Sequence, residues 1–553
     1  MFKGNDSRTP RFSFTGESWK NGAAAVTLPR GGRAMAAIAR PIPQVRIAEL
    51  HVPRDLGIVW FFVATKLLVH FLFNGGYGYF RDELYYLACA EHLDWGYVDQ
   101  PPLVAGVAWL VRHTIDDSLF ALRLFPALAG AAKILLTGLL VREFGGGRLA
   151  QGIACACVLF APGFLAIDNF LSMNAFEPVF WMGCALVLVR LVKTEDGRLW
   201  VWFGVLAGLG LQNKHSMLFF GFAAVVALLF TRHRRWLASK WMWMGGAIAL
   251  LIFLPNLMWQ IQRDFPTLEL LQNVKATGKN IVLNPLEYLG RQAFLMGFVN
   301  TPVWLAGLWF LFYHRIGRHF RVLGWTYLLL LALFIVFEAK DYYLGPIYPL
   351  LFAGGAVALE PLLGARRIYA LASLALITAM GVFGALLMMP ILPVEQNAAL
   401  LRWTGLQPPR SEVSHTSELP QHLSDQFGWE AMAAEVARIY HALPPEEREV
   451  TAIFGENYGQ AAAIDFFGPR YGLPRAISPH QNYFYWGPRQ YTGEIVIVLG
   501  SDREDLEEVF ESVEEVGRTN HPWAMPEENG PIYLCRRLRT PLGELWPKIK
   551  RWR

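Results

Sequence analysis

Long apolar segments separated by short polar loops occupy the chain up to about residue 390. A helix that crosses a membrane needs about 20 apolar residues, and about eleven segments approach that length. These segments are 56–74, 119–141, 148–167, 172–192, 199–213, 217–230, 243–262, 292–313, 322–338, 343–362 and 368–389. The pattern predicts a mainly α-helical, polytopic membrane protein with about eleven transmembrane helices, of which 199–213 and 217–230 are the least well defined.

The pattern changes beyond these segments. Residues 393–425 are polar and rich in Pro and Ser, as is typical of a linker. Short apolar runs and helical spacings then alternate, which predicts a soluble α/β domain over residues 426–553. The expected helices are 428–442, 459–467 and 503–512, and the expected strands are 450–454, 494–499 and 532–535. Because no glycine-rich G-x-G-x-x-G motif follows these strands, a nucleotide site is not expected there.

Composition and charge agree with insertion in a membrane. Hydrophobic residues make up 54% of the chain and charged residues only 17%, whereas soluble domains carry roughly 25% charged residues. One alternate set of loops is rich in cations, which by the positive-inside rule places those loops in the cytoplasm. The basic segment 1–54 has no signal-peptide core and is expected to be a cytoplasmic tail. Residues 55–392 are then the transmembrane domain, and residues 426–553 lie outside the cytoplasm.

The pattern contains no metal-binding signature. The five cysteines form neither a disulfide framework nor a zinc pattern. Cys155 and Cys157, two positions apart on a predicted helix, point to nearly opposite sides. No D-x-D motif of the kind that holds a metal and a nucleotide sugar is present. We therefore expect no metal and no other cofactor.

Two polar segments at the predicted outer face carry the candidate chemistry. The first, residues 79–102, contains Tyr-Phe-Arg-Asp-Glu-Leu-Tyr-Tyr and then His-Leu-Asp-Trp-Gly-Tyr-Val-Asp-Gln-Pro-Pro. The second, residues 338–349, reads Glu-Ala-Lys-Asp-Tyr-Tyr-Leu-Gly-Pro-Ile-Tyr-Pro. Carboxylates in the first segment suit proton transfer, although acids also complement the dipole of a helix N-terminus. The lysine in the second suits a phosphate, although it is also a plausible charged anchor paired with Asp341.

Both segments resemble motifs of glycosyltransferase family 39. This family includes the protein O-mannosyltransferases and the lipid A aminoarabinose transferases and has the GT-C fold. Residues 79–102 look like its first extracytoplasmic loop, and the resemblance implies that Asp82 is the catalytic base. Glu83 is the second catalytic candidate, and we expect it to orient the acceptor or Asp82. Residues 338–349 resemble the K-x-x-Y-x-L-P-x-x-P element, which implies that Lys340 and Tyr343 bind a lipid-linked phosphate. Glu456-Asn457-Tyr458-Gly459 and Trp486-Gly487-Pro488 resemble the outward-facing domain of bacterial members.

Five further residues are weaker candidates for substrate binding. Asp99 is a candidate for the sugar or the acceptor. Asn174 and Glu177 stand where many family members carry T-D-A-P-L, so the acid is displaced in this chain. Lys214 suits neutralisation of a phosphate, or it is a lysine that snorkels to the interface. Arg291, at the head of a predicted span, is a further candidate for the phosphate.

These features together predict a multi-pass protein of the bacterial inner membrane, with its N-terminus in the cytoplasm. We expect a glycosyltransferase that passes a hexose or pentose from a polyprenyl-phosphate donor to an envelope acceptor with inversion at the anomeric carbon. Its partners are the lipid-linked donor, membrane lipids and the acceptor, which is a lipid, a protein or a polysaccharide, and no nucleic acid. Two alternatives are a transporter or flippase of a lipid-linked sugar, and a membrane sensor whose outer domain binds a ligand.

Overall fold

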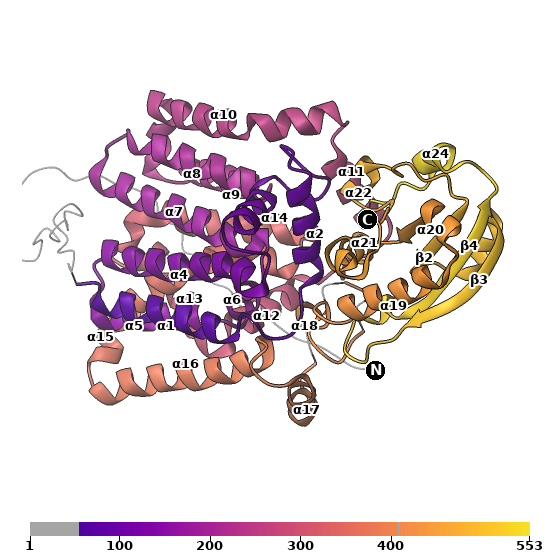
Figure 1. Ribbon diagram of the computed structural model, residues 1–553. Coiled ribbons are helices and arrows are strands. Elements are labelled where there is room, and N and C mark those ends of the chain that lie inside the picture. The colour runs from indigo at the N-terminus through magenta and orange to yellow at the C-terminus, as the bar shows by residue number, and fades with distance from the viewer. Residues whose placement is uncertain (1–54, 408–409, 411, 415, 553) are drawn as a thin grey trace, which may run out of the picture. The chain divides into compact units, whose positions relative to one another are not determined.

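The computed structural model describes residues 55–407, 410, 412–414 and 416–552 (Figure 1). The predicted cytoplasmic tail, residues 1–54, lies outside the described residues. The described part is mostly helical, with one four-stranded sheet near the C-terminus. The predicted fold class, a polytopic helical protein with a C-terminal α/β domain, is confirmed.

Each predicted apolar segment is helical. Single helices are α1 (Gly57–Phe73), α4 (Leu119–Glu143), α7 (Met173–Thr194), α8 (Leu199–Asn213), α9 (Met217–Leu229), α10 (Lys240–Gln262), α14 (Arg321–Val336), α15 (Tyr348–Gly364) and α16 (Arg367–Met388). The other two segments are broken, one into α5 (Arg148–Leu159) and α6 (Pro162–Ile167), the other into α12 (Pro285–Met296) and α13 (Thr301–Tyr313). Among the described residues, six helices are long and apolar enough to cross a membrane. The number is eight if two bent pairs each form one span, Met217–Leu229 with Arg232–Ala238 and Pro285–Met296 with Phe298–Tyr313. The chain is therefore a multi-pass membrane protein, and the number of eleven spans stays a prediction.

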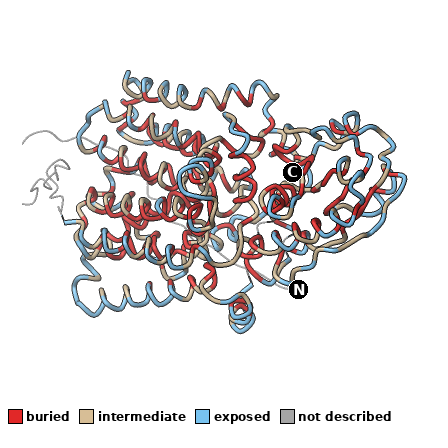
Figure 2. The backbone as a smooth tube through the Cα atoms, viewed as in Figure 1, coloured by how far each residue is buried: buried red, intermediate tan, exposed pale blue. Residues whose placement is uncertain are grey.

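The helices differ in how much of their apolar surface they bury. Helix α7 is mostly covered by its neighbours, whereas α10 and α16 expose large apolar side chains along their length (Figure 2). Such side chains are stable against lipid tails, which are as apolar as leucine. Inside the bundle, α13 and α15 cross closely, because a Cβ atom at Gly307 would lie 1.9 Å from the carbonyl oxygen of Leu351. Close crossings at small residues are typical of helix packing in membranes.

The C-terminal sheet has the strand order β1-β2-β4-β3. Its strands are β1 (Thr451–Gly455), β2 (Ile495–Leu499), β3 (Phe510–Thr519) and β4 (Gly530–Leu538), and only the pair β1 and β2 is parallel. One face packs against α19 (Trp429–Ala442) and α21 (Tyr458–Phe467). The other face packs against α23 (Arg503–Val509) and α24 (Leu542–Leu545). The three predicted strands and the first two predicted helices are all present.

Two predictions for the residues after the membrane domain, 393–553, need correction. The helix expected at 503–512 ends at Val509, because the next residues form β3. That strand lies at the edge of the sheet and exposes charged residues such as Glu511 and Glu514, so it lacks the apolar alternation of a strand. The segment 393–425, expected to be a linker, contains α17 (Val394–Thr404) and α18 (Gln421–Ser424). Leu401 and Leu423 are buried against α16, so this segment packs as part of the fold.

Two helices follow α1 before the chain enters α4: α2 (Arg81–Glu91) and α3 (Leu103–Thr114). Most residues of α2 are buried, and Leu84 to Ala90 share one apolar cluster with α3, α19 and α21. The contact with α21 is close, because a Cβ atom at Gly459 would lie 2.7 Å from Cγ of Arg81. Helix α2, which carries the candidate acids, is therefore held from both sides by parts of the chain far apart in sequence (Figure 1).

Candidate functional site

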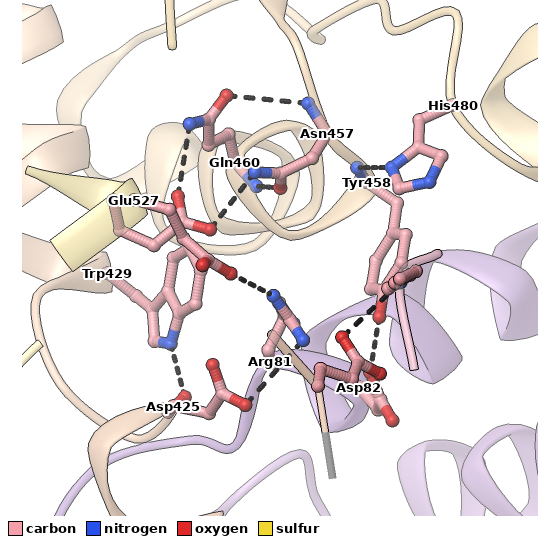
Figure 3. A network of polar contacts seen from close by, with 12 residues as sticks. Arg81, Asp82, Asp425, Trp429, Asn457, Tyr458, Gln460, His480 and Glu527 are labelled. Atoms are coloured by element: carbon pink, nitrogen blue, oxygen red, sulfur yellow. Dashed lines mark hydrogen bonds and ion pairs between the residues drawn. The ribbon is translucent and has the colours of Figure 1, made fainter. Parts of the chain in front are cut away.

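Asp82 lies in the first turn of α2, where the helix dipole favours a carboxylate. The hydroxyl of Tyr458 donates a hydrogen bond of 2.7 Å to its Oδ1 atom (Figure 3). Burial, with the nearby charge of Asp82, raises the pKa of Tyr458 well above its usual value. The phenol therefore keeps its proton and acts as the donor. Because Tyr458 opens α21, a side chain of the C-terminal domain directly contacts the predicted base.

Arg81, the neighbour of Asp82, forms ion pairs with two acids from distant parts of the chain (Figure 3). Its guanidinium lies 3.2 Å from Glu527 and 3.6 Å from Asp425. Burial raises the pKa of Asp425 to about 7 despite the opposing charge of Arg81, and the charges of Asp82 and Glu527 also raise it. Arg81 thus faces two acids where α2 meets the C-terminal domain, and Lys279 lies within electrostatic reach of Arg81.

Glu83 is fully buried and pairs with the equally buried Arg123 of α4. Arg123 donates through Nε and Nη2 to the two carboxylate oxygens, at 3.0 and 2.9 Å. The backbone amides of Phe80 and Leu171 also donate to the Glu83 carboxylate. The remaining donors of Arg123 reach the carbonyls of Asn74, Gly76 and Gly78 and the side chain of Gln426. These contacts favour Glu83 as the residue that fixes the start of α2 beside Asp82, which is the orienting role implied by the family resemblance.

Asp99 lies within electrostatic reach of Asp82. The Tyr85 hydroxyl donates to Asp99 Oδ1 at 3.1 Å. Burial and the charge of Asp82 raise the pKa of Asp99 to about 7, and Lys279 opposes this shift. Two carboxyl groups in one field ionise less readily together than apart. Asp99 is therefore suited to hold a proton, or to accept a hydrogen bond from a bound hydroxyl, close to the predicted base.

Four of the predicted substrate-binding residues form one cluster. The Lys214 ammonium lies 2.8 Å from Asn174 Oδ1, 2.9 Å from Glu177 Oε2 and 4.2 Å above the ring of Tyr343. The hydroxyl of Ser216 donates to the other oxygen of Glu177. Lys214 and Glu177 are almost completely buried, at 9% and 4% side-chain exposure. Lys214 is therefore paired inside the protein rather than snorkelling to the interface.

Lys340 pairs with Glu412 rather than with its neighbour Asp341. Its Nζ atom lies 2.6 Å from Glu412 Oε1. Burial opposes the charge on Lys340, yet Glu412 raises its pKa above the usual value, and the charge of Asp82 adds to the shift. Lys340 and Asp82 thus act on each other electrostatically, so the structure brings the two family-like segments together. Arg291 lies instead within electrostatic reach of Asp341.

Several residues of this region were not singled out from the sequence. Tyr458, Arg123 and Glu412 contact candidate residues that lie 40 or more positions away, and local spacing contains no signal for such pairs. Two other residues that were not singled out, Lys66 of α1 and Lys133 of α4, form buried ion pairs with Asp168. Lysines within apolar spans are a recognisable signal of such pairs. Among the described residues, no group of three or more His, Cys, Asp and Glu is placed to hold a metal ion.

Parts of the chain are similar to known proteins. Residues 99–259 match the family model described as dolichyl-phosphate-mannose-protein mannosyltransferase. Over 244 residues the chain is 26% identical to the lipid A galacturonosyltransferase RgtD of Rhizobium johnstonii, a match that covers 43% of this chain and 50% of that protein. The match thus spans half the length of this relative. The residues matched by the family model begin after Asp82 and end before Lys340.

Two solved structures of ArnT from Cupriavidus metallidurans are similar over most of the chain. The apo structure aligns with a TM-score of 0.56 at 15% identity, covering 86% of this chain and 98% of that chain. The structure bound to undecaprenyl phosphate aligns with a TM-score of 0.54 at 17% identity, covering 87% and 98%. At this identity the likeness establishes the fold. Together with the family match, it confirms the resemblance to membrane glycosyltransferases of the GT-C type.

Proposed function

We propose that this chain transfers a sugar from a polyprenyl-phosphate donor to an acceptor at the outer face of the bacterial inner membrane. The proposal is carried by two observations: Asp82 stands in the first turn of α2 with a hydrogen bond from Tyr458, and the Lys340 ammonium lies inside the protein within electrostatic reach of Asp82. A carboxylate base and a phosphate-binding cation are the two groups that such a transfer needs. The family match and the lipid phosphate bound to ArnT support the same donor class.

In the proposed reaction, a nucleophilic oxygen or nitrogen of the acceptor attacks the anomeric carbon of the sugar. Asp82 accepts the proton of the nucleophile as the new bond forms. The bond between the anomeric carbon and the phosphate oxygen breaks, and polyprenyl phosphate leaves with the electron pair. Lys340 stabilises the negative charge that develops on this phosphate. A single displacement of this kind inverts the configuration at the anomeric carbon.

The acceptor and the sugar are narrower parts of the proposal. The similar protein from Rhizobium johnstonii is named for lipid A and galacturonic acid, which favours a lipid acceptor and a hexuronic acid over a protein and mannose. The orientation rests on the cation-rich loops, which place Asp82 and the C-terminal domain outside the cytoplasm. A reporter enzyme that is active only outside the cytoplasm, fused to the C-terminus, should be active; inactivity of a stably expressed fusion would reverse the orientation.

The sharpest test replaces Asp82 with Asn. Asparagine keeps the size of the side chain and its hydrogen bond from Tyr458, but it cannot accept the proton. The purified full-length protein would be supplied with undecaprenyl-phosphate sugars and lipid A, and the products measured by mass spectrometry. Loss of a general base typically lowers the rate by about 10²–10⁴-fold, so transfer should fall by that amount while donor binding survives.

The matched control is Asp116→Asn. Asp116 is an exposed acid in the loop between α3 and α4, and its side chain accepts a bond from the backbone of Ser118. This variant should transfer sugar at the rate of the unchanged protein. Transfer by Asp82→Asn at the same rate as the control would show that Asp82 is no more than a favourable residue at the start of α2.

A further inference from the structure

We propose that Lys279 and Lys340 together bind the donor phosphate, and that the Glu412 carboxylate occupies this pair until the phosphate displaces it. The inference rests on the proposed function, because it concerns the donor of the same site. It adds one cation that the sequence motif does not contain and one acid that competes with the substrate.

The geometry shows one carboxylate bridging two ammonium groups. Glu412 Oε1 lies 2.6 Å from Lys340 Nζ, and Oε2 lies 3.5 Å from Lys279 Nζ. The Glu412 side chain is 9% exposed and that of Lys340 18%, whereas Lys279 is 34% exposed, so the bridge is buried at Lys340 and reaches the surface at Lys279. Two cations that converge on a single anionic group, one oxygen each, also suit a phosphate, which offers more oxygens and a larger charge.

The position of Glu412 in the chain allows exchange. Glu412 lies between α17 and α18, outside any helix. It is held near the lysines by an isolated antiparallel bridge with Asn280, and the Val413 amide donates to the Lys279 carbonyl at 3.0 Å. No helix therefore needs to unwind for the carboxylate to withdraw. Departure of Glu412 without a replacement would remove the anion that lies 2.6 Å from Lys340 inside the protein, which is costly, so entry of a phosphate and departure of Glu412 are coupled.

The charge balance favours this exchange during the reaction. A sugar phosphodiester carries one negative charge and matches the carboxylate that it replaces. After the sugar leaves, the phosphate is a monoester with about 1.5–2 negative charges at neutral pH. Two lysines stabilise that larger charge better than one, so the pair favours the leaving group over the bound donor. Burial lowers the pKa of Lys279, and the additional negative charge of a monoester opposes that shift.

The test measures binding of undecaprenyl phosphate, without a sugar, to the full-length protein in lipid nanodiscs. Glu412→Gln removes the competing charge and should tighten binding by about 10-fold, whereas Lys279→Gln should weaken it by about 10-fold, the effect of a modest charge interaction. Glu418→Gln is the matched control, since Glu418 is an exposed acid of the same segment that pairs with Arg402. Undecaprenol, which lacks the phosphate, should bind equally to all variants.

Hydrogen exchange on the unchanged protein gives a second readout that needs no variant. Undecaprenyl phosphate should speed exchange of the Val413 amide, because its bond to the Lys279 carbonyl opens, and undecaprenol should not. Weaker or unchanged phosphate binding by Glu412→Gln, or unchanged exchange at Val413, would show that Glu412 only stabilises the fold and would overturn the proposal. If these results hold but no sugar is transferred from any donor, the phosphate site stands and the transferase activity falls. Sugar transfer without these results refutes this inference alone.

Discussion

Replacement of Arg123 by Met tests how far the buried Arg123–Glu83 pair holds the catalytic helix in place. Both side chains have 0% exposure. Methionine fills a similar apolar volume but leaves Glu83 with two backbone donors, the amides of Phe80 and Leu171. Removing one partner of a buried ion pair typically costs about 3–5 kcal/mol, because an uncompensated charge stays behind. We expect the free energy of unfolding to fall by about that amount.

A double-mutant cycle separates the pair from its surroundings. Glu83→Gln should cost less, about 1–3 kcal/mol, because Arg123 keeps its three backbone carbonyl acceptors and the amide oxygen of Gln426. The variant with both replacements buries no unpaired charge, and double replacement of buried pairs is often much milder than single replacement. The loss in the double variant should therefore be smaller than the sum of the two single losses by about 1–3 kcal/mol.

Unfolding can be followed by titration with sodium dodecyl sulfate in mixed micelles, with transfer activity measured on the same samples. Arg402→Met is the matched control, because Arg402 forms an exposed pair with Glu418, and such pairs contribute about 0–1 kcal/mol. The transfer rate should fall in Arg123→Met under conditions where the protein stays folded, since Asp82 follows directly on the segment that Arg123 anchors. Equal unfolding of Arg123→Met and Arg402→Met, or strictly additive losses in the cycle, would refute this account.

Two further measurements test the neighbourhood of the base. Tyr458→Phe removes the bond to Asp82 and should lower kcat by about 10-fold with little change in KM for the donor, since a hydrogen bond to a charged group is worth about 1.5–3 kcal/mol. The control is Tyr440→Phe, because the Tyr440 hydroxyl donates to the Arg448 carbonyl away from the site. Equal kcat in the two variants would contradict a role of Tyr458 in orienting Asp82. The pKa of Asp425 is raised from 3.8 to about 7 in the folded protein. Between about pH 4 and 7 the folded protein therefore keeps a proton on Asp425 that the unfolded chain has already released. The contribution of this group to stability falls as pH rises through that window. Asp425→Asn should flatten the dependence of unfolding on pH in this window, and an unchanged slope would show that Asp425 titrates normally.

The hydrophobic pattern predicted the helices of the membrane domain because a segment in lipid needs a continuous apolar run, which is visible in one dimension. It did not predict the breaks in two of those segments, between α5 and α6 and between α12 and α13. Both breaks have a local cause that hydropathy does not register: Pro162 begins α6, and α12 ends before Gly297, whose φ is 88°. Strand β3 was missed for the opposite reason: an exposed edge strand needs little apolar surface, so its sequence, rich in glutamate, does not alternate.

The site was predicted only where a short stretch of sequence contains the signal. Motif resemblance picked out Asp82 and Lys340, each within a short characteristic segment. Asn174, Glu177 and Lys214 were proposed separately and lie together in the structure, because charged groups near the bilayer need partners. The contacts made by Glu412 and Tyr458 were not predicted, since pairs separated by 72 positions (Lys340 and Glu412) or 376 positions (Asp82 and Tyr458) have no counterpart in local spacing.

The position of α2 makes the C-terminal domain part of the site rather than an attachment to it. The helix is mostly buried, and its apolar residues Leu84 to Ala90 pack in one cluster with α21 and α19. Without those helices this apolar surface would face water, which is unfavourable in proportion to its area. Asp82 would also lose its bond from Tyr458. The predicted base lies in the first loop of the membrane domain but accepts a hydrogen bond from a residue more than 370 positions later, so we expect a change in either part to alter the position of Asp82.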